Sequence, residues 1–187
     1  MKKILFFILI GFTSQIVKSQ PKNYVNTENA TLEEAFYKNY EKIAPGCLEK
    51  EQLKKLKQSL QKWNVNLDSI KTMHFYYSKD ERDCKSIKSR ITNGDYYFMI
   101  EHKRHMPVTK IYKPLLYVKP ESVEADEIWK NDVSNYFFNL FFKDLNRKFI
   151  SAAITVNSNG IYFTHFNIFD PVVFNAFSNE VGKYNCD

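Results

Sequence analysis

The histidines of this chain are its best candidates for acid–base or metal chemistry, because imidazole titrates near neutral pH and ligates metal ions. The closest pair is His102 and His105, with the carboxylate of Glu101 beside it. In a β-strand, residues three apart point to opposite faces, so these two imidazoles meet only where the chain turns between them. The sequence has neither a Cys-x-x-Cys nor a His-Glu-x-x-His spacing. We therefore predict two exposed or edge-strand histidines and no metal site.

A third histidine, His165, lies between Thr164 and Phe166 in a segment of strand-like composition. On a sheet face that opens into a cleft, it could act as a general base. The sequence has only five glycines and no nucleophile elbow, Ser-x-x-Lys pair or Gly-rich phosphate loop. A small hydrolase-type enzyme that uses His165, or the His102/His105 pair with Glu101, is therefore the alternative hypothesis. No cofactor is expected.

Basic and aromatic side chains alternate between residues 96 and 119, which makes this stretch a candidate binding surface. Such side chains together can hold an acidic glycan, an anionic surface or a partner protein. The competing interpretation is a charged sheet edge that prevents strand pairing between molecules. The candidate binding residues are Tyr97, Lys103, Arg104, Tyr112 and Lys113.

The three cysteines are Cys47, Cys84 and Cys186. An oxidising compartment permits disulfides, and an odd count leaves at least one thiol over. We predict one bridge and one buried free thiol, and the sequence leaves the pairing open. A bridge to Cys186 would hold down a C-terminal tail that would otherwise fray.

The N-terminus has the three-part pattern of a secretory signal peptide. Lys2 and Lys3 precede an apolar run at residues 4–12, and small or tolerated residues precede Gln20. The run is too short for a membrane span, which needs roughly 20 residues. We predict a signal peptide over residues 1–19, a flexible lead over 20–30 and export to the periplasm or beyond the cell. No membrane span is expected after signal removal.

Removing the signal takes away three lysines and no acid, so the formal net charge falls from +6 to +3. That weak charge does not favour nucleic acid as a partner. A protein, a glycan or a small apolar ligand remains possible, and the oligomeric state is left open.

The remaining chain, residues 31–187, has the pattern of a single α+β domain. A capping box at Thr31 and Glu34 begins a helix that ends before Pro45, and a second helix covers residues 48–63. We expect these two helices to form an antiparallel hairpin. A second capping box at 78–81 begins a short helix that ends at Asn93-Gly94, and the competing interpretation is a hairpin strand that ends in an Asn-Gly turn.

The expected sheet is mostly antiparallel, with about five strands. These strands lie at residues 72–77, 96–102, 108–118 (one strand bent or broken at Pro114, or two short ones), 149–156 and 161–168. Asn157 to Gly160 joins the last two as a hairpin. Asp170 and Pro171 begin a short closing helix.

A long central helix is expected over residues 122–146, with apolar side chains on several of its faces. Such a helix could pack between the sheet and the hairpin, or line a pocket for an apolar ligand. Because no catalytic motif is present, the leading hypothesis is an exported, non-catalytic binding or interaction protein. The alternatives are the hydrolase-type enzyme and a carrier of an apolar ligand.

Overall fold

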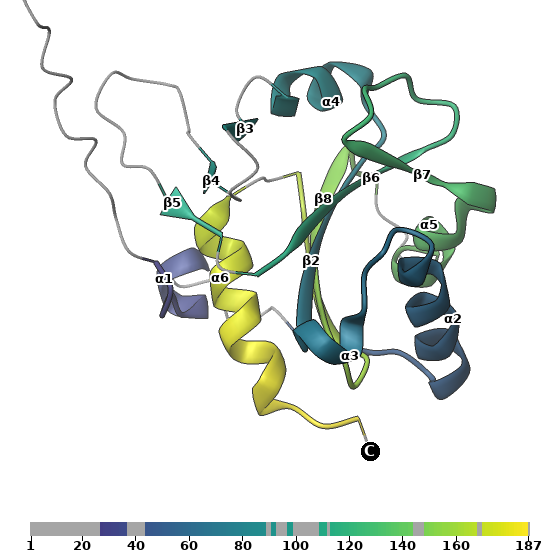
Figure 1. The fold of residues 1–187 in the computed structure, drawn as a ribbon. Helices are drawn as coiled ribbons and strands as arrows, with labels where there is room; N and C mark the ends of the chain where they lie inside the picture. The colour runs from purple at the N-terminus through teal and green to yellow at the C-terminus, as the bar shows by residue number, and fades with distance from the viewer. Residues whose placement is uncertain are drawn as a thin grey trace, which may run out of the picture.

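A mixed six-stranded sheet, with helices on both faces, forms the centre of the protein (Figure 1). The computed structural model describes residues 27–36, 44–88, 91–92, 97–98, 109–111, 113–143, 148–167 and 170–186. The strand order is β1-β9-β8-β2-β6-β7. The central strand β2 pairs antiparallel with β8 and parallel with β6, and β6 pairs parallel with β7. The domain is therefore α+β, as predicted, with a mixed rather than mostly antiparallel sheet.

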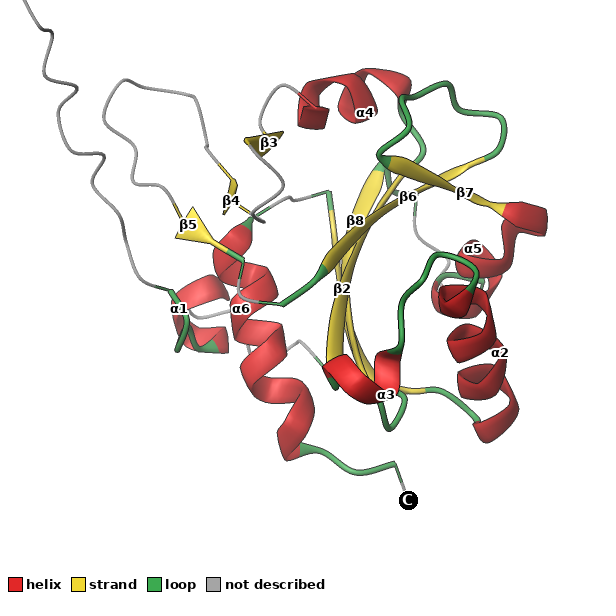
Figure 2. Cartoon of the chain, in the orientation of Figure 1, coloured by secondary structure: helices red, strands yellow, loops and turns green. Residues whose placement is uncertain are grey.

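The strands and helices of the described residues follow one another along the chain as Figure 2 shows. The strands of the large sheet are β1 (Gly46–Cys47), β2 (Thr72–Ser78), β6 (Leu115–Pro120), β7 (Trp129–Asp132), β8 (Ser151–Asn157) and β9 (Ile161–Phe166). A separate small sheet contains β3 (Ile91–Thr92), β4 (Tyr97–Phe98) and β5 (Thr109–Lys110). The helices are α1 (Leu32–Phe36), α2 (Lys50–Gln61), α3 (Leu67–Ile70), α4 (Glu81–Lys88), α5 (Tyr136–Phe141) and α6 (Pro171–Glu180).

The side chains of β2 point alternately to the two faces of the sheet. Met73, Phe75 and Tyr77 belong to a core shared with α2 and α5, and Phe75 is fully buried. Tyr76 belongs to a second core on the opposite face, where the ring of His74 packs against α6. Because both faces of the sheet are covered, β2 is buried from Met73 to Ser78, including the polar side chains His74 and Ser78.

Several local predictions are confirmed. Thr31 and Glu34 form the capping box, with the Glu34 amide 3.2 Å from the Thr31 hydroxyl and the Thr31 amide 2.8 Å from the Glu34 carboxylate. Asp170 caps α6 by accepting from the Val172 amide at 2.8 Å. The strands predicted at residues 149–156 and 161–168 correspond to β8 and β9, and their connecting turn closes with a hydrogen bond from the Gly160 amide to the Asn157 carbonyl.

The predicted helical hairpin is wrong. The chain between the two helices forms β1, which pairs with β9 instead of turning the second helix back onto the first. Gly46 lies so close to the Tyr162 ring that a side chain has no room there. As a result α1 lies beside α6, and α2 lies on the opposite face of the sheet (Figure 1).

The predicted long helix over 122–146 is also wrong. Trp129–Asp132 forms the edge strand β7, and a 3-10 turn at Val133–Asn135 leads into the short helix α5. Ser134 and Asn135 have left-handed backbones, with φ of 58° and 54°. The apolar side chains of this segment do not cover several faces of one helix. They pack into two cores on opposite sides of the sheet. Trp129 packs in one core and Phe137 in the other.

The structure also differs from two smaller predictions near α4, which concern the residue that caps the helix and the residue at which the helix ends. The carboxylate of Asp80, not Ser78, caps the helix by accepting from the amides of Arg82 and Asp83. The helix ends at Lys88, so Ile91 lies in β3 instead. The stretch 108–118, predicted as one strand bent or broken at Pro114 or as two short strands, forms two strands: β5 in the small sheet and β6 in the large one.

The cysteines form one disulfide and one free thiol, as predicted. Cys47 in β1 is bonded to Cys186 in the C-terminal tail, and both residues are exposed. Cys84 is buried, and burial raises the pKa of its thiol to about 11. A thiol that stays protonated at neutral pH is a poor nucleophile, so Cys84 has a structural role.

Candidate ligand-binding pocket

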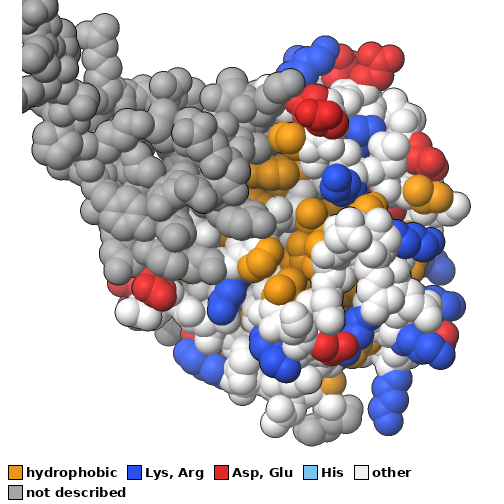
Figure 3. All heavy atoms as spheres, viewed as in Figure 1, with side chains coloured by type: hydrophobic (Ala, Val, Ile, Leu, Met, Phe, Trp, Pro, Cys, Tyr) orange, Lys and Arg blue, Asp and Glu red, His pale blue; other side chains and the backbone are white. Residues whose placement is uncertain are grey.

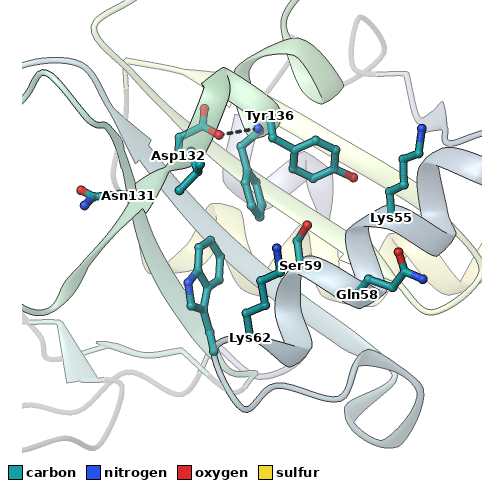
Figure 4. Close-up of a pocket in the computed structure, with 10 residues that line it drawn as sticks. Lys55, Gln58, Ser59, Lys62, Asn131, Asp132 and Tyr136 are labelled. Atoms are coloured by element: carbon teal, nitrogen blue, oxygen red, sulfur yellow. Dashed lines mark hydrogen bonds between the residues drawn. The ribbon is translucent and has the colours of Figure 1, made fainter.

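A surface pocket of about 370 Å³ lies between α2 and the segment that runs from β7 into α5 (Figure 4). This volume is within the usual range for small-molecule sites. The pocket has an aromatic and aliphatic interior with polar groups around it. Its lining residues are Lys55, Gln58, Ser59, Lys62, Trp63, Asn131, Asp132, Val133, Tyr136 and Phe137.

Helix α2 presents one of its faces to this pocket. Lys55, Ser59 and Lys62 are spaced i, i+4 and i+7, which places them in one row along the helix. A neighbouring face carries Leu56 and Leu60, both fully buried in the core. The amphipathic pattern of α2 therefore fixes which side chains reach the pocket, because the leucines must face the sheet.

The interior of the pocket is aromatic. The rings of Trp63 and Phe137 are stacked, with centroids 5.4 Å apart and planes at 20°. Tyr136 meets Phe137 edge to face at 5.6 Å. The Tyr136 hydroxyl donates to the Gln52 carbonyl at 3.4 Å, which links α5 to α2 behind the pocket. The buried Phe137 ring supports the half-buried rings of Trp63 and Tyr136, which give a fixed surface for a flat apolar group.

Asp132 forms part of the wall, and its carboxylate is fully used inside the protein. One oxygen accepts from the Phe137 amide at 2.6 Å, and the other accepts from the Phe138 amide at 2.9 Å and the Tyr77 hydroxyl at 3.2 Å. Burial raises the pKa of this carboxyl, and these three hydrogen bonds oppose that rise. The side chain therefore serves to begin α5 and to attach it to β2, and at 1% exposure it has no access to substrate.

Replacing Asp132 with Ala should lower the free energy of unfolding by about 2 kcal/mol, because two helix amides and a tyrosine hydroxyl lose a charged acceptor. Urea unfolding followed by circular dichroism measures this change. Glu121→Ala is the matched control, since that exposed carboxylate touches the same turn only through a 3.4 Å contact with the Ser134 amide. Equal stability of Asp132→Ala and wild type would show that Asp132 does not hold the turn.

The turn at the rim of the pocket has two unusual features. Val133 is 62% exposed, which is high for an aliphatic residue. Ser134 and Asn135 follow it with consecutive left-handed backbones. Such conformations cost free energy for residues other than glycine and are concentrated at binding and catalytic sites. The hydrogen bonds that the Asp132 carboxylate accepts from the first amides of α5 offset part of this free-energy cost.

The charge at the pocket is positive. Within the described part of the chain, neither Lys55 nor Lys62 has an ion-pair partner, whereas the neighbouring Lys57 is bonded to Asp68 at 2.7 Å. In Figure 4 the Lys62 side chain extends toward the centre of the pocket, and Lys55 lies toward its other end. Figure 3 shows basic side chains, in blue, on the side of the molecule where α2 lies, with acidic side chains among them; α2 itself carries lysines and no arginine.

The predicted catalytic residues lie elsewhere. His165 is in β9, half-buried, with its ring 4.7 Å from the ring of Phe36 in α1. The charge of His165 also acts to lower the pKa of Asp170, although burial dominates and raises it. This contact is on the opposite side of the sheet from α2, so His165 is not part of the pocket. Glu101, His102 and His105 lie outside the described residues.

The predicted binding stretch is only partly described. Lys103, Arg104 and Tyr112 lie outside the described residues, as does the side chain of Tyr97. Lys113 is exposed, and its charge contributes to lowering the pKa of His74. Among the residues that the structure does describe, no three His, Cys, Asp or Glu side chains gather as metal ligands.

The pocket was missed in the sequence because its two sides are far apart along the chain. The row of Lys55, Ser59 and Lys62, followed by Trp63, was a usable signal on one side. On the other side, the prediction of one continuous helix over residues 122–146 left no turn at Val133. Phe141 and Phe142, on the helix expected over residues 122–146, are core residues at 3% and 2% exposure.

No protein-family model, curated protein or solved structure matches this chain.

Proposed function

We propose that this protein is an exported, non-catalytic binding protein whose ligand site is the pocket between α2 and β7–α5. The observation that carries the proposal is the pairing of an aromatic interior, built from Trp63, Tyr136 and Phe137, with two lysines that have no acid partner among the described residues. Concave sites with an apolar interior and a few polar groups are typical of small-molecule binding.

Binding without catalysis is supported by the chemistry of the lining groups. Among the described lining residues the single carboxylate, Asp132, has both oxygens occupied by internal donors. Ser59 has neither a histidine nor a carboxylate available beside it in the lining to remove its proton. The lining can therefore orient a ligand, and it lacks a matched acid and base for proton transfer.

Export is supported by two observations. The N-terminal pattern of Lys2, Lys3 and the apolar run is that of a cleaved signal. The exposed disulfide between Cys47 and Cys186 is compatible with an oxidising compartment. Among the described helices, none has the length and apolar composition needed to cross a bilayer.

The proposal is tested by nuclear magnetic resonance with a panel of small aromatic and aliphatic compounds. The two tryptophans act as internal reporters, because Trp63 lines the pocket and Trp129 packs on the other face of the sheet. We expect bound compounds to shift the indole Nε1–H signal of Trp63 and to leave that of Trp129 unchanged.

A pocket-filling variant, Ser59→Tyr, should abolish these shifts, whereas Ser69→Tyr, on the exposed surface of α3, should preserve them. If no compound of the panel moves the Trp63 signal, or if the shifts survive in Ser59→Tyr, the pocket is not the binding site.

A further inference from the structure

We propose that the pocket selects free small molecules that carry a flat aromatic ring and a carboxylate. This inference rests on the proposed function and names the class of ligand for the same site. It follows from three features: the arrangement of the aromatic rings, the row of Lys55, Ser59 and Lys62 on α2, and the internal hydrogen bonds that occupy the Asp132 carboxylate.

The rings define the apolar part of the ligand. Trp63 and Phe137 are parallel within 20°, and Tyr136 is nearly perpendicular to Phe137 at 85°. Phe137 is 2% exposed and supports the Trp63 ring from the core, so the rings that a ligand can reach are the half-buried Trp63 and Tyr136. A planar group can stack against one of these two rings and meet the other with its edge, which are the two arrangements that aromatic pairs favour. Val133, exposed at the rim, adds an aliphatic contact on the β7–α5 side.

The α2 row defines the charged part. Lys55 and Lys62 are seven residues apart, or about 10 Å along the helix axis, and Ser59 lies between them. The flexible stems of both lysines can bring their ammonium groups to one anion. The Ser59 hydroxyl can donate to the same carboxylate.

The lysines, and not Asp132, set the charge preference of the site. Asp132 is the single acid among the described lining residues, and its carboxylate already accepts from two amides and the Tyr77 hydroxyl, so it offers no free acceptor to a ligand cation. A ligand cation would therefore meet two lysines and no available carboxylate, while a ligand anion would gain two charge-assisted contacts. The volume of about 370 Å³ fits a free small molecule rather than a segment of a folded partner.

Three matched probes separate the contributions of ring and charge: 2-naphthoate, neutral 2-naphthamide and 2-naphthylmethylammonium. We expect naphthoate to bind at least tenfold more tightly than the amide, and the cation to bind weakest, as measured by titration of the Trp63 indole signal. The preference for naphthoate should decrease as salt concentration rises, because the lysines are exposed.

The double variant Lys55→Gln/Lys62→Gln should bring the affinities for naphthoate and the amide within twofold of each other. Lys54→Gln removes a charge from the same helix without touching the pocket lining, so it should retain the preference. The amide binding as tightly as naphthoate, or the preference surviving in the double variant, would overturn the ligand class and leave the pocket as a binding site. Failure of these probes and of the whole compound panel to move the Trp63 signal would overturn the proposed function itself.

Discussion

Loss of the Cys47–Cys186 disulfide should lower the free energy of unfolding by about 4 kcal/mol. The two cysteines are 139 residues apart in the sequence, so the bond closes most of the chain into one loop and restricts the unfolded state strongly. In the folded state it ties the C-terminal tail to β1, a two-residue strand at the edge of the sheet. Urea unfolding of Cys47→Ala/Cys186→Ala against wild type measures the effect.

A reducing agent supplies the control for this prediction. Wild type with reductant should reach the stability of the double variant, and the variant should not respond to reductant, because its remaining thiol, Cys84, is already free. A variant as stable as oxidised wild type would show that the bond contributes nothing to folding.

Acid should destabilise the protein through His74, by about 3 kcal/mol between pH 7 and pH 4. This histidine is fully buried, with Nδ1 2.8 Å from the Thr155 hydroxyl and its ring 5.0 Å from that of Phe174. Within the described part of the chain, Nε2 has no hydrogen-bond partner. Burial, with a smaller contribution from the charge of Lys113, lowers the pKa from 6.5 to about 3.

The sign of the effect follows from that shift in pKa. Between pH 6.5 and pH 3 the unfolded chain binds a proton at His74 and the folded protein does not, so each lower pH unit favours unfolding. The stability from this histidine is complete above pH 6.5 and is lost as the pH falls toward 3. Carboxylates titrate in the same range, so the contribution of His74 is isolated as a difference between variants.

Two variants and one control define that difference. His74→Gln, and His74→Phe/Thr155→Val, which removes both polar partners, should each flatten the dependence of unfolding free energy on pH by about 3 kcal/mol. Thr155→Val alone keeps the titrating ring and should keep the acid sensitivity. The same loss between pH 7 and pH 4 in all four proteins would show that His74 does not titrate on unfolding.

Local features of the sequence predicted local structure well. Thr31 and Glu34 place a capping box, Asp170 and Pro171 begin α6, and the alternation of residues 72–77 marks the central strand. These features depend on neighbours within four residues, whose geometry the backbone fixes by itself. The number of cysteines likewise implied one bridge and one thiol, without giving the pairing.

Tertiary structure alone decided the elements whose partners are distant in sequence. Residues 129–141 have enough apolar side chains for a long helix, yet Trp129 and Phe137 pack on opposite faces of the sheet, which one continuous helix cannot arrange. Pairing with β6 makes Trp129–Asp132 a strand, and the Asp132 carboxylate begins the helix that follows.

The candidate site depends on the same long-range contacts. The row of Lys55, Ser59 and Lys62 was visible as one face of an amphipathic helix, but the helical hairpin would have placed α2 on α1. Because β1 pairs with β9, α2 lies on the other face of the sheet, across the pocket from the turn at Val133. Periodicity therefore determined which side chains α2 exposes, and only the order of strands in the sheet determined what those side chains face, because strand pairing joins segments that local sequence does not connect.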